Sequence, residues 1–249
     1  MSFEVRNIKI GEGIPKICVP IVGTTYDEII DAAKRIKNEA FDIVEWRVDF
    51  FDEVFDQYKV KKAAAGLRDV LDDAPILFTF RTKKEGGQKE IEGNSYTALL
   101  NFASTLEYID LIDVEVFFKD ADIQNIITTA HDNNTKVIAS NHDFNQTPAH
   151  DEIISRLVKM DEIGADILKI AVMPQCKGDV ITLLSATVDA EDKVNGKPVV
   201  TISMGQTGLI SRISGSFTNS AITFGTVGKT SAPGQIDSNK LNDILNLIG

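Results

Sequence analysis

The chain contains little of what disulfide-rich, zinc-binding or membrane proteins need. Its 249 residues include 2 cysteines and 3 histidines, too few for a disulfide framework or a Cys-His zinc cluster. No apolar run approaches the roughly 18–20 residues that span a bilayer, and residues 1–11 are polar and charged rather than signal-like. We therefore expect a cytoplasmic protein that holds no metal.

Positive charge is scarce as well. The chain has 26 Lys and Arg residues against 37 Asp and Glu residues, a formal net charge of −11 at pH 7. A surface this acidic repels phosphate backbones and anionic lipid headgroups. We therefore expect neither a nucleic acid nor a membrane as partner, and an anionic small-molecule substrate would need a local cluster of cations.

Short β-branched apolar runs alternate with longer amphipathic segments along the chain. Each strand-like run follows the previous one by about thirty residues, the length of one βα unit. The expected strands are Lys16–Val22, Ile43–Val48, Pro75–Phe80, Ile109–Val114, Lys136–Ser140, Ile167–Ala171, Pro198–Ser203 and Ala221–Phe224. The expected helices are Asp27–Asn38, Gln57–Leu71, Tyr96–Thr105, Asp120–His131, Glu152–Met160, Gly178–Glu191, Leu209–Ile213 and Asp237–Leu247.

Eight similar units without a linker favour a single-domain (β/α)8 TIM barrel over residues 1–249. An open, doubly wound parallel sheet is the alternative architecture. The alternating segments Phe3–Val5 and Ile8–Ile10 suggest a short N-terminal β-hairpin that covers the barrel floor. In such a barrel the chemistry lies at the carboxyl ends of the strands, so polar residues expected there are the functional candidates.

Three arginines fall at these expected strand ends: Arg47, Arg81 and Arg212. Guanidinium groups match carboxylates in bidentate geometry, so the cluster predicts an anionic or polyhydroxyl ligand. Unpaired arginines inside a barrel would be costly, and some internal pairing is therefore expected. The partners expected for Arg47 and Arg81 are Glu45, Asp113 and Glu115.

Lys169 lies inside an otherwise apolar strand, where a buried ammonium is costly. Either its amine reaches water at a strand end, or desolvation and nearby cations keep it a neutral amine that attacks a carbonyl. The arginines at neighbouring strand ends favour the second interpretation.

His142 falls where the strand 136–140 meets its loop, in the expected barrel mouth. An isolated histidine is usually structural, but this position makes His142 a candidate acid–base group. Glu85, which follows the strand ending near Arg81, is the residue expected to orient it.

Two glycine-containing loops resemble functional loops of other proteins. The polar run 82–94 contains Gly86-Gly87 and is either a flexible lid or an ordinary loose loop. The run 225–230 looks like a phosphate loop, but Thr223 stands where a Walker motif needs glycine. We therefore set that motif aside.

Taken in order, these segments resemble the type I 3-dehydroquinate dehydratase family. Each matching segment is weak alone, but the ordered set is specific and spans nearly the whole chain. The matches are Glu45-Trp-Arg-Val-Asp49, Phe78-Thr-Phe-Arg-Thr82 with Glu85-Gly-Gly87, Ser140-Asn-His-Asp-Phe144, Lys169-Ile-Ala-Val-Met-Pro174, Ser203-Met204, Thr207-Gly208 to Ser211-Arg212, and Ser231-Ala-Pro-Gly-Gln235.

The resemblance implies a homodimeric barrel that converts 3-dehydroquinate to 3-dehydroshikimate and water on the shikimate route to chorismate. It implies no metal and no dissociable cofactor, because Lys169 would form an imine with the substrate ketone while His142, partnered by Glu85, acts as base and then acid. Pro20 departs from the serine of some relatives, which puts one hydroxyl contact in doubt. By the same resemblance, Glu45, Arg47 and Arg81 surround the ring hydroxyls and Arg212, Ser231 and Gln235 hold the carboxylate. Met204 and Phe224 are expected to pack the site, although both would fit an ordinary core.

Two other functions stay open from the residues alone. A class I aldolase would share the barrel and Lys169, but the combination of Arg212 with Ser231 and Gln235 favours a carboxylate over a phosphate. A non-catalytic sensor of quinate-like ligands would need the anchoring residues but neither Lys169 nor His142.

Overall fold

Parallel strands closed into a barrel form the centre of the part of the chain that the structure, a computed structural model, describes: residues 2–228 and 231–249. Consecutive strands pair in parallel from β3 to β9, and β10 pairs with β3. Between β9 and β10 the Ala221 amide donates to the Val199 carbonyl at 2.8 Å, beside a bridge between Val199 and Ser220. The barrel strands are β3 Lys16–Ile21, β4 Ile43–Arg47, β5 Ile76–Thr79, β6 Leu111–Glu115, β7 Lys136–Asp143, β8 Ile167–Val172, β9 Val199–Ser203 and β10 Ile222–Thr226.

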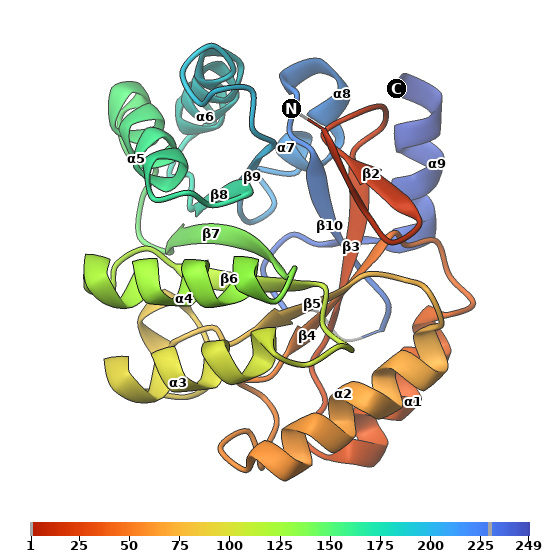
Figure 1. Ribbon diagram of the computed structural model, residues 1–249. Coiled ribbons are helices and arrows are strands. Elements are labelled where there is room, and N and C mark those ends of the chain that lie inside the picture. The colour runs from red at the N-terminus through yellow and green to blue at the C-terminus, as the bar shows by residue number, and fades with distance from the viewer. Residues whose placement is uncertain (1, 229–230) are drawn as a thin grey trace.

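Helices surround this barrel as an outer layer (Figure 1). Side-chain caps fix where some of them begin: the Thr25 hydroxyl accepts from the amide of Glu28, and Asp56 accepts from the amide of Tyr58. No helix in the described part of the chain is long and apolar enough to cross a membrane. The helices are α1 Tyr26–Ile36, α2 Gln57–Leu71, α3 Gly93–Ser104, α4 Asp120–Asp132, α5 His150–Glu162, α6 Lys177–Ala190, α7 Ile210–Ile213, α8 Gly215–Thr218 and α9 Ser238–Ile248.

The closed sheet confirms the predicted (β/α)8 barrel and excludes the open doubly wound alternative. Three short elements were not predicted: the 3-10 turn η1 at Lys83–Glu85, helix α8, and β11 at Ile236–Asp237, which extends the sheet beside β10. Strand β7 also runs three residues past its predicted end, so His142 lies on the strand itself. Positions 229 and 230 of the phosphate-loop-like run lie outside the described residues.

The barrel interior divides into an apolar floor and a charged upper half. The predicted hairpin is present as β1 Phe3–Val5 paired with β2 Ile8–Ile10, and Val5 and Ile10 pack under the barrel in the floor cluster. Two residues further along the faces of β4 to β8, the side chains become polar. The floor is formed by Cys18, Ile43, Leu77, Leu111, Ile138, Ile167, Val200 and Ile222. The polar residues above it are Glu45, Thr79, Asp113, Ser140 and Lys169.

Candidate active site

A pocket of about 510 Å³, including its open mouth, lies at the carboxyl ends of the barrel strands. The structure brings every residue expected to be catalytic or to contact the substrate to the wall of this one pocket. These residues are Lys169, His142, Glu85, Glu45, Arg47, Arg81, Arg212, Ser231, Gln235, Met204 and Phe224. Gly86, Phe144, Ala171, Ile202 and Ala232 complete the wall.

The amine of Lys169 lies inside the barrel between two carboxylates. Its Nζ is 3.3 Å from Asp113 Oδ2 and 3.8 Å from Glu45 Oε1, and the residue is 3% exposed. The amine therefore does not reach water at a strand end. The charged groups that pair with the amine are these carboxylates rather than the arginines of the neighbouring strand ends. The ring of Phe224 covers the amine, with its centroid 4.4 Å from Nζ.

Arg81 holds the buried carboxylates of this region together. Its guanidinium lies 2.8 Å from Asp113 and 3.0 Å from Glu115, and its Nη1 also donates to the Ser140 hydroxyl at 3.0 Å. Although burial opposes the charge, these acids raise the pKa of Arg81 well above its ordinary value. Burial likewise opposes ionisation of Asp113, but Arg81 and Lys169 hold its pKa below the usual range. Asp113 is therefore a carboxylate beside the lysine.

His142 is oriented by Glu85 from the loop after β5. Glu85 Oε2 lies 2.9 Å from His142 Nδ1 and also accepts the backbone amide of His142 at 3.0 Å. These two contacts of Glu85 Oε2 fix both the end of β7 and the orientation of the His142 ring. Because Nδ1 is engaged by Glu85, Nε2 is the ring nitrogen left for a ligand in the pocket.

The environment shifts the proton affinities of this pair in opposite directions. Burial, followed by the charge of Arg81, lowers the pKa of His142 well below its ordinary value. Burial and the carboxylate of Glu115 raise the pKa of Glu85 to about 8. Since the two groups share a hydrogen bond, they gain and lose protons as a unit. The form that has lost a proton carries a lone pair on Nε2 and can act as a base.

Arg47 pairs with Asp49 rather than with Glu45. The contact is bidentate, with Nε and Nη2 at 2.8 and 2.9 Å from the two carboxylate oxygens of Asp49. Asp49 is fully buried and is not among the pocket-lining residues. It holds Arg47 at the pocket wall from behind, a role that the sequence analysis did not assign.

Arg212 differs from the other pocket arginines because no carboxylate pairs with it among the described residues. Its Nη1 and Nη2 donate to the carbonyls of Phe224 and Pro233 at 3.3 and 3.0 Å, and its Nε has no partner there. Arg212 is 2% exposed, and burial lowers its pKa to about 10. A buried, incompletely paired cation facing a pocket is a site for an anionic group.

Ser231 and Gln235 stand together on the same side of the pocket. The Gln235 amide nitrogen donates to the Ser231 hydroxyl at 3.1 Å, and the Ser231 backbone amide donates to Gln235 Oε1 at 2.9 Å. Pro20, the departure noted in the sequence, does not line this pocket and instead borders a separate hollow beside α1.

The loop 82–94, considered as a lid, is held to the residues that follow β4. Thr82 bridges to Lys89, whose Nζ donates to the carbonyls of Asp49 and Phe51 at 2.8 and 2.9 Å. Gly87 is required there, because a Cβ would lie 1.8 Å from the Arg81 carbonyl oxygen. These contacts fix the loop so that Glu85 lies beside His142.

Asp113 and Glu115 were expected only as ion-pair partners of the arginines, and both do pair with Arg81. They occupy alternate positions on β6, so both point into the barrel. Ser140 does the same on β7 and donates to Asp113 at 2.6 Å. The reasoning that selected Lys169 would have selected these residues too. Among residues 2–228 and 231–249, no group of three or more His, Cys, Asp or Glu side chains is arranged to hold a metal ion.

The chain is similar in sequence to a known family of enzymes. Residues 17–249 match the type I 3-dehydroquinase family. The chain is 51% identical over 245 residues to the 3-dehydroquinate dehydratase of Clostridium botulinum, covering 98% of this chain and 96% of the relative. It is 50% identical over 244 residues to that of Listeria innocua, with the same two coverages of 98% and 96%.

Solved structures agree with the sequence matches. The type I 3-dehydroquinate dehydratase of Clostridium difficile, crystallised with covalently modified comenic acid, has a TM-score of 0.97 at 48% identity, covering 100% of this chain and 98% of that one. The enzyme of Geobacillus kaustophilus gives 0.97 at 34% identity, with coverages of 100% and 96%. These matches favour a dehydratase over the aldolase and the sensor. The chain belongs to the type I 3-dehydroquinase family of hydro-lyases.

Proposed function

We propose that this chain removes water from 3-dehydroquinate through an imine on Lys169. The observation that carries the proposal is one pocket holding three groups: the buried amine of Lys169, the imidazole of His142, and the carboxylate-free guanidinium of Arg212. A ketone, an acidic C–H bond and a carboxylate are the complementary features of that substrate.

The first step attaches the substrate. Lys169 loses a proton, for which Asp113 and Glu45 are the nearest carboxylates, and Nζ attacks the ketone carbon. The carbonyl oxygen leaves as water and a protonated imine remains. The imine is an electron sink next to the carbon that must lose its proton.

The second step is the elimination. His142 Nε2 removes the proton from the adjacent carbon, and the electron pair is held as an enamine. The enamine then expels the hydroxyl group, which takes a proton from the imidazolium and departs as water. Hydrolysis of the new imine releases 3-dehydroshikimate and restores Lys169. The balance is the loss of one water molecule, with no redox change.

Binding groups orient the ring for these steps. Arg212, with Ser231 and Gln235, holds the carboxylate, while Glu45, Arg47 and Arg81 contact the ring hydroxyls. Fixing both ends of the ring places the reacting carbon opposite His142. Met204 and Phe224 cover the site and exclude water.

The chemistry above uses side chains of this chain alone, so we propose an enzyme without a metal or dissociable cofactor. A single catalytic domain over residues 1–249, a homodimer, a cytoplasmic location, and the absence of nucleic-acid and membrane partners remain predictions from the sequence and the family resemblance.

Borohydride trapping tests the imine. We expect sodium borohydride to inactivate the protein only with 3-dehydroquinate or 3-dehydroshikimate present, and mass spectrometry to locate the reduced adduct on Lys169. Lys169→Ala should form no adduct and lose turnover, whereas Lys197→Ala, near the opposite end of the barrel, should behave as the unmodified protein. Undiminished turnover by Lys169→Ala would contradict the proposal.

Substituting His142 separates attachment from elimination. His142→Ala should still form the borohydride-trapped imine but turn over about 10²–10⁴-fold more slowly, because it lacks the acid–base group. In the unmodified protein kcat/KM should fall as the pH drops below about 8 and the Glu85–His142 pair takes up a proton. Near-normal turnover of His142→Ala, followed by enone absorbance, would show that the base is another residue.

The buried charge of Arg212 should lower the stability of the unliganded protein while it strengthens substrate binding. Burial lowers the pKa of Arg212 to about 10 in the folded state. At pH 7 the folded protein therefore carries the full cost of burying the charge, and this cost is relieved only as the pH rises above about 10. We expect Arg212→Met to raise the free energy of unfolding of the unliganded protein by about 1–2 kcal/mol.

The same substitution should raise KM by about 10–100-fold, because a charge-assisted contact to the carboxylate is lost. Urea denaturation and steady-state kinetics measure the two effects, with the exposed Arg35→Met as control. A less stable variant with unchanged KM would contradict the assignment of Arg212.

A further inference from the structure

We infer that Arg156 on α5, acting through Asn141, is a positioning residue for the Glu85–His142 pair. It lies outside the pocket wall and fixes which end of the Asn141 amide faces Glu85. The inference rests on the proposed function only in taking this pair as the acid–base group. The structural link is a chain of three contacts from the helix layer to the imidazole.

Asn141 sits between the catalytic strand face and the helices. It precedes His142 on β7, so its side chain leaves the opposite face of the strand, and it is buried. Its amide nitrogen lies 3.5 Å from Glu85 Oε1, while its amide oxygen accepts from Arg156 Nη1 at 2.8 Å. Glu85 in turn contacts His142 through its other oxygen.

The direction of the Asn141 amide follows from Arg156. An asparagine amide can rotate to exchange its oxygen and nitrogen, and either end could face a carboxyl group. A guanidinium is only a donor, so the end facing Arg156 must be the oxygen. The N–H groups of Asn141 are then left to face Glu85, where they stabilise its carboxylate form.

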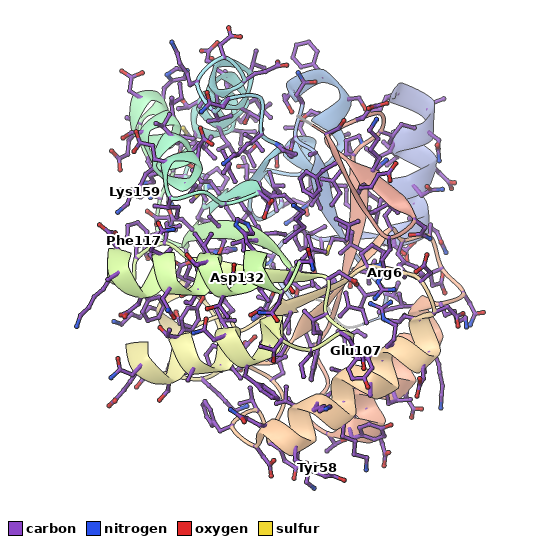
Figure 2. The ribbon with its side chains drawn as sticks, viewed as in Figure 1. Arg6, Tyr58, Glu107, Phe117, Asp132 and Lys159 are labelled. Atoms are coloured by element: carbon purple, nitrogen blue, oxygen red, sulfur yellow. The ribbon has the colours of Figure 1, made fainter. Side chains whose placement is uncertain are left out.

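Arg156 is itself held in place. Its Nε donates to Glu152 one turn earlier on α5 at 2.8 Å, and its guanidinium lies 5.8 Å from the ring centroid of Phe117. Phe117, labelled in Figure 2, lies at the edge of the barrel near α4 and α5. The guanidinium therefore has a defined orientation, as a role in positioning Asn141 requires.

Other charged groups also face the pair, and the effect of Arg156 adds to theirs. Arg81 lies 3.6 Å from Glu85 and favours its carboxylate form, while the carboxylates of β6 favour the protonated form. Lys169 on β8 and Arg47 on β4 oppose a proton on His142. Without Arg156 the Asn141 amide can rotate, and its oxygen would then accept a hydrogen bond from a protonated Glu85. Loss of Arg156 should therefore make the pair hold its proton to higher pH.

An NMR titration of the substrate-free protein tests this directly. The chain has only 3 histidines, so the His142 ring signal can be assigned by its loss in His142→Ala. We expect Arg156→Met to move the titration midpoint of the pair up by about half to one pH unit. The low-pH limb of kcat/KM should move by the same amount, while borohydride trapping on Lys169 persists.

The control removes a charge from the same helix without touching Asn141. Lys159, labelled in Figure 2, is exposed on α5 and pairs with Asp120, so Lys159→Met should leave the midpoint unchanged. Asn141→Leu should shift the midpoint upward, and the double variant with Arg156→Met should shift it no further, because both act through one contact. Glu152→Gln should give a smaller upward shift.

An unchanged midpoint in folded Arg156→Met, or a shift equal to that of Lys159→Met, would overturn the inference. A rate that falls equally at every pH would do the same, because it indicates only structural damage. Neither outcome bears on whether His142 is the base, since the His142→Ala turnover decides that separately.

Discussion

The ion pairs made by Arg81 are the interaction on which the pocket depends. Its guanidinium lies within 3.6 Å of carboxylate oxygens of Asp113, Glu115 and Glu85. Three acids this close together in a buried site could not all remain ionised without a cation among them. Arg81, together with Lys169, keeps Asp113 a carboxylate. Burial and Glu115 raise the pKa of Glu85 to about 8, and the charge of Arg81 opposes that rise. One side chain thus acts on both halves of the proposed mechanism.

The fold separates these charges from the apolar half of the barrel interior. The floor of the barrel is apolar and is covered by the hairpin, and the charged side chains of the interior lie in the upper half. There the cations other than Arg212 already have carboxylate partners. Arg212 is left with backbone carbonyls, and an arriving carboxylate completes its pairing. The preference for an anionic substrate therefore follows from Arg212, which has no carboxylate partner among the described residues, although the net charge of the chain is −11.

The barrel and the pocket residues could be predicted because both depend on regular patterns. Strand spacing fixes the eight units, and a polar residue inside an apolar strand stands out, as Lys169 does. The pairing of Arg81 with Asp113 and Glu115 was expected from the sequence, but the partner of Arg47 was not. Arg47 pairs with Asp49, two residues along the chain, because the backbone leaves β4 at that point. The carboxylates around Lys169 and the contact of Arg156 with Asn141 depend on side-chain directions that only the closed barrel determines.

One pocket should hold the ketone carbon at Lys169 and the carboxylate at Arg212. A crystal structure of the protein soaked with 3-dehydroshikimate would show whether it does. We expect continuous density from Nζ of Lys169 to a ring carbon, with the carboxylate bound by Arg212, Ser231 and Gln235, and the ring beneath His142. A ligand bound without a bond to Nζ, with its carboxylate away from Arg212, would contradict the account.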